Sequence, residues 1–86
     1  MTTFSAYTIT EIIEKHSGLR VRWNRDAQRP IWAAMDIAKI LSLPELPPTD
    51  VELLVGWEKI IPGLTLPQLL ALLENHPSSI SKALLL

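Results

Sequence analysis

The stretch from Pro30 to Leu43, P-I-W-A-A-M-D-I-A-K-I-L-S-L, constrains the fold of this chain more than any other. Its apolar start predicts a short strand, and the i, i+3, i+4 spacing of later apolar residues predicts a helix with one buried face. These apolar residues are Ile37, Ile40 and Leu41. Asp36 falls near the helix start, where a carboxylate can accept hydrogen bonds from free backbone N–H groups. Because Pro44 closes the helix, the stretch predicts a strand–helix unit on which the rest of the chain packs.

The length and composition of the chain indicate how many domains it forms and where in the cell it is expected. With 86 residues, of which 48% are hydrophobic, it is long enough for one compact domain and too short for two. It contains no cysteine, which excludes disulfides and cysteine nucleophiles. It shows no signal-peptide pattern and no apolar run near the roughly 20 residues of a membrane span. We therefore expect a cytoplasmic protein that makes no contact with a membrane.

Charge is distributed unevenly, although the net charge is only −1. Residues 15–29 hold five basic residues and one acidic residue, whereas residues 1–14 and residues 30–86 are both acidic. A basic segment of this kind could contact the phosphates of a nucleic acid. The candidate contacts are Arg20, Arg22, Arg25 and Arg29. The alternative is that these arginines pair with carboxylates of the same domain.

A helix and then a hairpin are predicted for the first half of the chain. Thr8 and Glu11 have the spacing of a capping box for a helix from about Ile9 to His16, and Gly18 has the position of a left-handed stop. The alternating segment 19–23 predicts a strand, and turn residues after it let the start of the strand–helix unit return as its partner. Two strands alone are marginal in water, so we expect the hairpin to pack on helices.

Helices are predicted for the second half, after a proline-rich connector at residues 44–49. A capping-box spacing predicts a helix from about Asp50 to Ile60, with Pro62 as its breaker. A further box predicts a helix from Thr65 to about Asn75, and a short serine-capped helix ends the chain. The expected fold is α+β but mostly α, with a short two-stranded β-hairpin packed on four to five short helices. The expected single domain, 1–86, divides into residues 1–43, 44–49 and 50–86.

Residues that could carry catalysis are scarce. The two histidines, His16 and His76, lie sixty residues apart with no motif around either, and the chain has no Gly-rich phosphate loop or nucleophile elbow. A metal site is not indicated by this spacing. We therefore expect a protein that is not an enzyme, with no catalytic or metal-binding residues, no cofactor and no small-molecule substrate.

Residues 19–43 are similar to the opening of the BRO-type (antirepressor) N-terminal domain of phages and large DNA viruses. That family shows a strand, a turn and an aromatic-bearing strand that leads into D-V-A-x-x-L-G-Y. Trp32 matches the aromatic residue, Asp36 the aspartate and Leu41 the leucine, whereas Ser42 and the residue after it stand where Gly and Tyr are usual. The resemblance implies DNA binding and gene regulation, with Arg20, Arg22 and Arg25 on phosphates.

The C-terminal segment 69–84, L-L-A-L-L-E-N-H-P-S-S-I-S-K-A-L, looks like a helix-turn-helix pattern. In that pattern the second helix enters the major groove, so the resemblance places its polar residues toward DNA and Ile80 and Leu84 inward. The polar residues are Ser78, Ser79, Ser81 and Lys82, of which Ser79 and Lys82 are the candidate groove contacts. A helical hairpin that only packs in the core would produce the same pattern.

The chain contains fifteen leucines, more than a core of this size buries easily. Such a surplus favours an exposed apolar surface for a partner protein or a second copy of the chain. The candidate interface residues are Leu69, Leu73, Leu84 and Leu85. The sequence thus predicts a small DNA-binding or gene-regulatory protein of phage or mobile-element type that forms a homodimer. The alternative is a protein–protein adaptor or self-associating module that uses the leucine-rich C-terminal helical hairpin.

Overall fold

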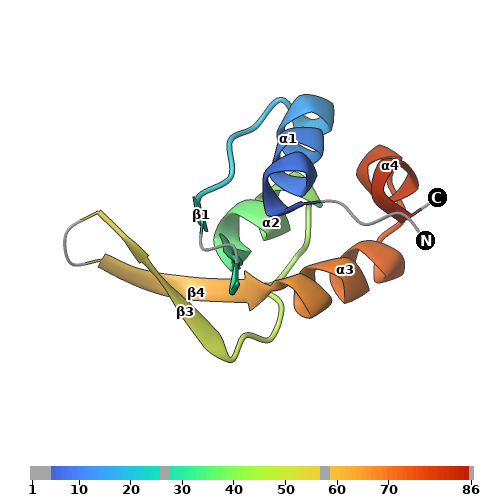
Figure 1. Cartoon of the computed structure of the whole chain (residues 1–86). Helices are drawn as coiled ribbons and strands as arrows, with labels where there is room; N and C mark the ends of the chain where they lie inside the picture. Colours follow the sequence, from blue (N-terminus) through green and yellow to red (C-terminus); the bar gives the residue numbers. More distant parts are fainter. Residues whose placement is uncertain (1–4, 26–27, 57–58, 86) are drawn as a thin grey trace.

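The computed structural model describes residues 5–25, 28–56 and 59–85, which form four helices and four strands (Figure 1). In chain order these elements are α1 (Ala6–Ser17), β1 (Trp23–Asn24), β2 (Ile31–Ala33), α2 (Ala34–Ile40), β3 (Val51–Val55), β4 (Lys59–Thr65), α3 (Leu66–Asn75) and α4 (Ser79–Leu85). Strand β2 runs directly into α2, which confirms the strand–helix unit, and β4 runs directly into α3. The far end of the β3–β4 hairpin extends away from the helices.

The four strands form one antiparallel sheet in the order β1-β2-β4-β3. The expected β1–β2 hairpin is confirmed in its pairing, because Trp23 pairs with Trp32, but its first strand is shorter than predicted, since Trp23 is the only residue of the segment 19–23 that belongs to β1. The sheet continues through β4, which pairs with β2 at Leu64 and with β3 between Leu53 and Ile61. The edge strands β1 and β3 come close to each other, so the sheet is curled. The expectation of a lone two-stranded hairpin on four to five helices is therefore wrong, although the α+β class holds.

Strands β3 and β4 replace the helix that was expected from Asp50 to Ile60. A capping-box spacing predicted that helix, but the residues after it alternate in burial: Leu53 is 3% exposed and Leu54 is 63% exposed. This alternation is the period of a strand with one covered face. Gly56, with a φ of 65°, begins the turn at the position where the helix would have had to continue. Burial of one side of the hairpin thus outweighs a helix signal that was purely local.

Two residues that predicted a helix end lie inside β4 instead. Strand β2 flanks only residues 63–65 of β4, so Pro62 lies outside the part that has a neighbour on both sides. A missing N–H donor is tolerated there. Gly63 pairs with β2 and β3 at once, and a Cβ atom on it would collide with the side chain of Ile31. A glycine is therefore needed where the sheet is most crowded.

The helices cover one face of the sheet and form the main core with it. Trp32 and Leu64, which are paired across β2 and β4, pack with Ile13 of α1, Ile37 of α2 and Leu69 of α3. None of these five side chains is more than 1% exposed. A second, smaller cluster lies on the other face of the sheet. It consists of Ala33, Leu53 and Ile61.

The helix ends follow the predicted chemistry with one exception. Helix α1 begins three residues earlier than predicted, because Ser5 is its N-cap and accepts a hydrogen bond of 3.2 Å from the N–H of Thr8. The predicted box at Thr8 is therefore wrong. Gly18 ends the helix with a φ of 71°, as predicted. The box of α3 is confirmed, since Oε1 of Gln68 accepts from the N–H of Thr65 at 3.0 Å.

Helix α2 ends on a left-handed residue that is not glycine. Ser42 has a φ of 55°, its N–H donates to the carbonyl of Lys39, and the N–H of Leu43 donates to the carbonyl of Ala38 at 2.9 Å. This pair of bonds is a Schellman motif, in which glycine is the usual left-handed residue.

Candidate nucleic-acid interface

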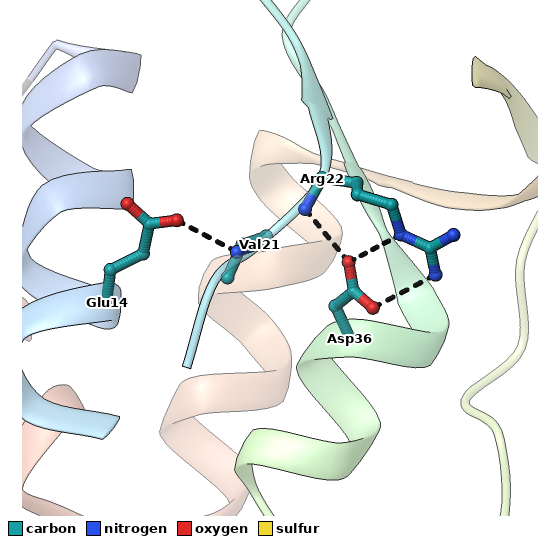
Figure 2. A network of polar contacts seen from close by, with 4 residues as sticks. All are labelled: Glu14, Val21, Arg22 and Asp36. Carbon is teal, nitrogen blue, oxygen red and sulfur yellow. Dashed lines mark hydrogen bonds and ion pairs between the residues drawn. The ribbon is translucent and has the colours of Figure 1, made fainter. Parts of the chain in front are cut away.

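Two carboxylates hold the backbone that leads into β1. Oε2 of Glu14, on α1, accepts a hydrogen bond of 2.9 Å from the N–H of Val21, and Oδ2 of Asp36, on α2, accepts one of 2.8 Å from the N–H of Arg22 (Figure 2). These two consecutive N–H groups precede the strand and would otherwise lack a partner in the sheet. The segment is therefore fixed between two helices, with the side chain of Val21 buried.

Arg22 and Asp36 also form a two-point ion pair. Nε of Arg22 lies 3.0 Å from Oδ2 of Asp36, and Nη2 lies 3.0 Å from Oδ1. Parallel bonds of this kind are the strongest form of contact between arginine and a carboxylate. Partial burial alone would raise the pKa of Asp36, but the hydrogen bonds and the charge of Arg22 outweigh it, so the pKa lies below its usual value. The guanidinium of Arg22 is thus bound by a carboxylate of the same domain, so Arg22 is no longer a candidate phosphate contact.

The other three candidate arginines remain exposed. Arg20 precedes β1, and Arg25 and Arg29 lie in the connection between β1 and β2. Among the described residues, none of the three forms an ion pair with a carboxylate. The guanidinium of Arg25 lies 5.9 Å from the ring centroid of Trp23, within the range of a cation–π contact. Arg29 lines a cleft of about 400 Å³ between the starts of α1 and α3.

An aromatic column connects this basic segment to the core. Trp32 is fully buried, and its Nε1 donates to Oγ1 of Thr10 at 2.7 Å. Trp23 stacks on Trp32 with ring centroids 5.8 Å apart and an interplanar angle of 7°. Tyr7 meets Trp23 edge-on, with centroids 5.0 Å apart and an angle of 82°. The column therefore reaches from the middle of the domain to the surface, where Tyr7 is 61% exposed.

The C-terminal helices match the predicted helical hairpin in part. Ile80 is 4% exposed and Leu84 is 8% exposed, so both point inward as predicted, and α4 packs against α1 and α3. Ser79 and Lys82 are exposed and stay candidate contacts. Ser81 is buried, because its Oγ accepts from the N–H of Ser78 at 2.6 Å at the start of α4. The prediction that Ser81 faces DNA is therefore wrong.

The leucines that were expected to form a partner interface belong to the core. Leu69 is 0% exposed, Leu73 is 1% exposed, and both belong with Leu84 to the main cluster. Because these three leucines are buried in the core, they offer no surface to a partner. The side chain of Leu85, the fourth candidate, lies outside the described part of the structure. The large exposed apolar residues of the second half include Leu54 and Ile60, which face each other on the β3–β4 hairpin.

The two histidines, distant in sequence, line one cleft of about 430 Å³. His16 comes from the last turn of α1, and His76 follows the end of α3. In the described ranges, no group of three or more His, Cys, Asp or Glu side chains is placed to hold a metal ion. Within the same ranges, no helix is long and apolar enough to cross a membrane.

Two features of this surface were not predicted from the sequence. Neither the exposed ring of Tyr7 beside Trp23 nor the contact of Glu14 with the backbone was foreseen. Both depend on how α1 crosses the strand that follows it, because Glu14 reaches a backbone N–H seven residues later and Tyr7 reaches Trp23. Contacts of this kind between a helix and a later segment have no fixed spacing in the sequence, so the sequence alone does not predict them.

Comparison with protein-family models, with curated proteins and with solved structures gives no match to this chain. What this surface can bind is therefore argued from its own residues.

Proposed function

We propose that the protein is a small, non-enzymatic DNA-binding regulator of phage or mobile-element type that acts in the cytoplasm. Its main contacts are Arg20, Arg25 and Arg29, which meet the phosphates of the nucleic acid. Ser79 and Lys82 on α4 are secondary contacts. The protein needs no cofactor for this role and binds as a homodimer.

One observation carries the proposal: three exposed arginines of the basic segment form no ion pair with a carboxylate among the described residues, and the backbone beside one of them, Arg20, is held by the domain. Glu14 and Asp36 fix the backbone at Val21 and Arg22, so the side chain of Arg20 leaves a fixed backbone. A charged side chain on a backbone that is already fixed loses less conformational entropy on binding than one on a loose chain. The local positive charge attracts phosphate even though the whole chain carries a net charge of −1.

A titration with labelled random-sequence DNA, duplex and single-stranded, at two salt concentrations tests the proposal. Phosphate contacts release counterions, so affinity should fall steeply between about 50 and about 200 mM salt. Replacing Arg20, Arg25 and Arg29 together by glutamine should weaken binding at low salt and lower the salt slope by about one for each lost contact.

The matched control replaces Lys39 and Lys59 by glutamine and is compared with a variant that replaces Arg20 and Arg25, because both variants lose two positive charges and the lysines lie outside the basic segment. It should bind more tightly than the arginine variant. Equal effects of the two variants would show a nonspecific response to net charge, and no detectable binding by the unaltered protein at low salt would refute the proposal. Arg22 is unsuitable for this test, because its loss also breaks the contact with Asp36.

A second candidate function is self-association or adaptor activity through the β3–β4 hairpin. It is supported by Leu54 and Ile60, which pair across the hairpin and are 63% and 58% exposed. The last strand in the sheet order, β3, is paired with β4 along one side only within the described residues. Its single charged residue is Glu52, whereas edge strands are usually protected by more charge or by proline.

A further inference from the structure

The exposed end of the aromatic column is held in place from the core outward. Trp32 cannot shift, because it is fully buried and its indole N–H is bound by Thr10. Trp23 lies parallel to Trp32, and Tyr7 packs edge-on against Trp23. Tyr7 also belongs to α1, which restricts its backbone. An exposed ring that is fixed in this way loses little conformational freedom when a ligand stacks on it.

The charge around the column selects the kind of ligand. The guanidinium of Arg25 lies over the ring of Trp23. Arg29 lines the cleft together with Ser5 and Ala6, which directly precede Tyr7 in the chain. A cationic ligand would be repelled by these arginines. A ligand that combines a flat π-system with negative charge would gain both stacking and ion pairing. Nucleotides have this combination, since every base has a π-face and every linkage carries a phosphate.

We propose that Tyr7 and Trp23, together with Arg25, form a stacking platform for an unpaired nucleobase, so that the protein prefers a single strand to a duplex. The inference rests on the proposed function and names the form of nucleic acid that the basic segment takes. Bases of an intact duplex are stacked on their neighbours and cannot reach a protein ring without being flipped out. A single strand offers its bases directly, and the adjacent arginines then track its phosphates.

The test measures binding of labelled oligo(dT) of about 12 nucleotides and of a duplex of the same length by fluorescence anisotropy. The unaltered protein should bind oligo(dT) more tightly than the duplex. Tyr7→Ala should weaken binding to oligo(dT) by about tenfold, since stacking on an aromatic ring contributes on this scale for each base. Its affinity for the duplex should be unchanged. Tyr7→Phe, which keeps the ring, should restore binding to oligo(dT).

The control variant is Leu46→Ala, which shortens an exposed apolar side chain of the connector, away from both the aromatic column and the β3–β4 hairpin, and it should leave both affinities unchanged. RNA offers the same base chemistry, so oligo(rU) is compared with oligo(dT). Tighter binding of oligo(rU) with the same dependence on Tyr7 would support the platform and assign the strand to RNA.

Two outcomes overturn the inference and can be told apart. If binding depends on salt and on the arginines but Tyr7→Ala binds oligo(dT) as well as the unaltered protein does, the platform is refuted and the proposed function stands. If no nucleic acid binds at low salt, both are refuted.

Discussion

At the scale of single residues, Asp36 shows how a side chain that the sequence places at a helix start can bind a distant segment of the fold. It stands at the aspartate of the BRO-type pattern, and the sequence suggested a role at the start of a helix. In the structure it makes no cap bond to its own helix and instead accepts three hydrogen bonds from Arg22. Its effect is to join α2 to the segment before β1, so the residue positions the basic segment without contacting a ligand.

The prediction at this scale concerns Asp36→Asn and its dependence on pH. Arg22 is 44% exposed, so the ion pair itself contributes less than about 1 kcal/mol, and the bond to the backbone N–H adds about as much. We therefore expect the variant to lose about 1–2 kcal/mol of unfolding free energy at neutral pH, measured by urea denaturation.

The sign of the pH dependence follows from the lowered pKa of Asp36. The stabilisation is fully present above the unfolded pKa of about 3.9 and is lost as the pH falls through the folded value. The difference between Asp36→Asn and the unaltered protein should therefore shrink below pH about 4. Glu74→Gln, at an exposed carboxylate of α3, is the control and should show a smaller loss at neutral pH. A constant difference across this range would contradict the assignment.

At the scale of elements, several signals between neighbours in sequence predicted well, but the boxes at Thr8 and before the expected Asp50–Ile60 helix did not, and the extension of the sheet through β4 and β3 was missed. The β1–β2 hairpin, the β2–α2 unit, the stop at Gly18 and the box at Thr65 each depend on a few adjacent residues. The β3–β4 hairpin does not. Pairing of β4 with β2 brings Ala33 against Leu53 and Ile61 and buries them in the second cluster. This burial depends on a distant strand, so the residues near the hairpin do not predict it.

The same limit explains which parts of the candidate surface were predicted. The basic composition of residues 15–29 is visible in the sequence, so Arg20, Arg25 and Arg29 were found. The sequence did not show that Arg22 differs from these three arginines. Arg22 pairs with Asp36, which comes near it only after the chain has folded back. The surplus of leucine pointed to the wrong surface, since the sheet provides the space that buries Leu69 and Leu73.

The prediction for an element concerns self-association through the β3–β4 hairpin. If Leu54 and Ile60 meet a second copy, Leu54→Lys should weaken the dimer by about tenfold or more, because a charge would enter an apolar contact. Analytical ultracentrifugation over a range of concentrations measures this change. Leu46→Lys, at an exposed leucine of the connector, should leave the dimer intact. A protein that is monomeric at all concentrations, or a Leu54→Lys variant that dimerises normally, would exclude this surface.

At the scale of the whole molecule, the helix-covered part of the sheet and the far end of the β3–β4 hairpin carry different surfaces. One face and its helices provide the main core, from which the aromatic column reaches the surface beside the basic segment. The β3–β4 hairpin extends away from the helices and carries the exposed apolar pair (Figure 1). The account therefore assigns nucleic acid and a second copy of the chain to different surfaces, which separate variants can test independently.

Mapping of backbone amide shifts by NMR during a titration with a short DNA strand tests the central claim most directly. The account predicts that the largest changes fall at Tyr7 and in residues 19–25 and 28–31, that smaller changes fall near Ser79 and Lys82, and that the hairpin from Val51 to Thr65 stays largely unaffected. Changes centred on that hairpin, or no saturable change at low salt, would contradict it.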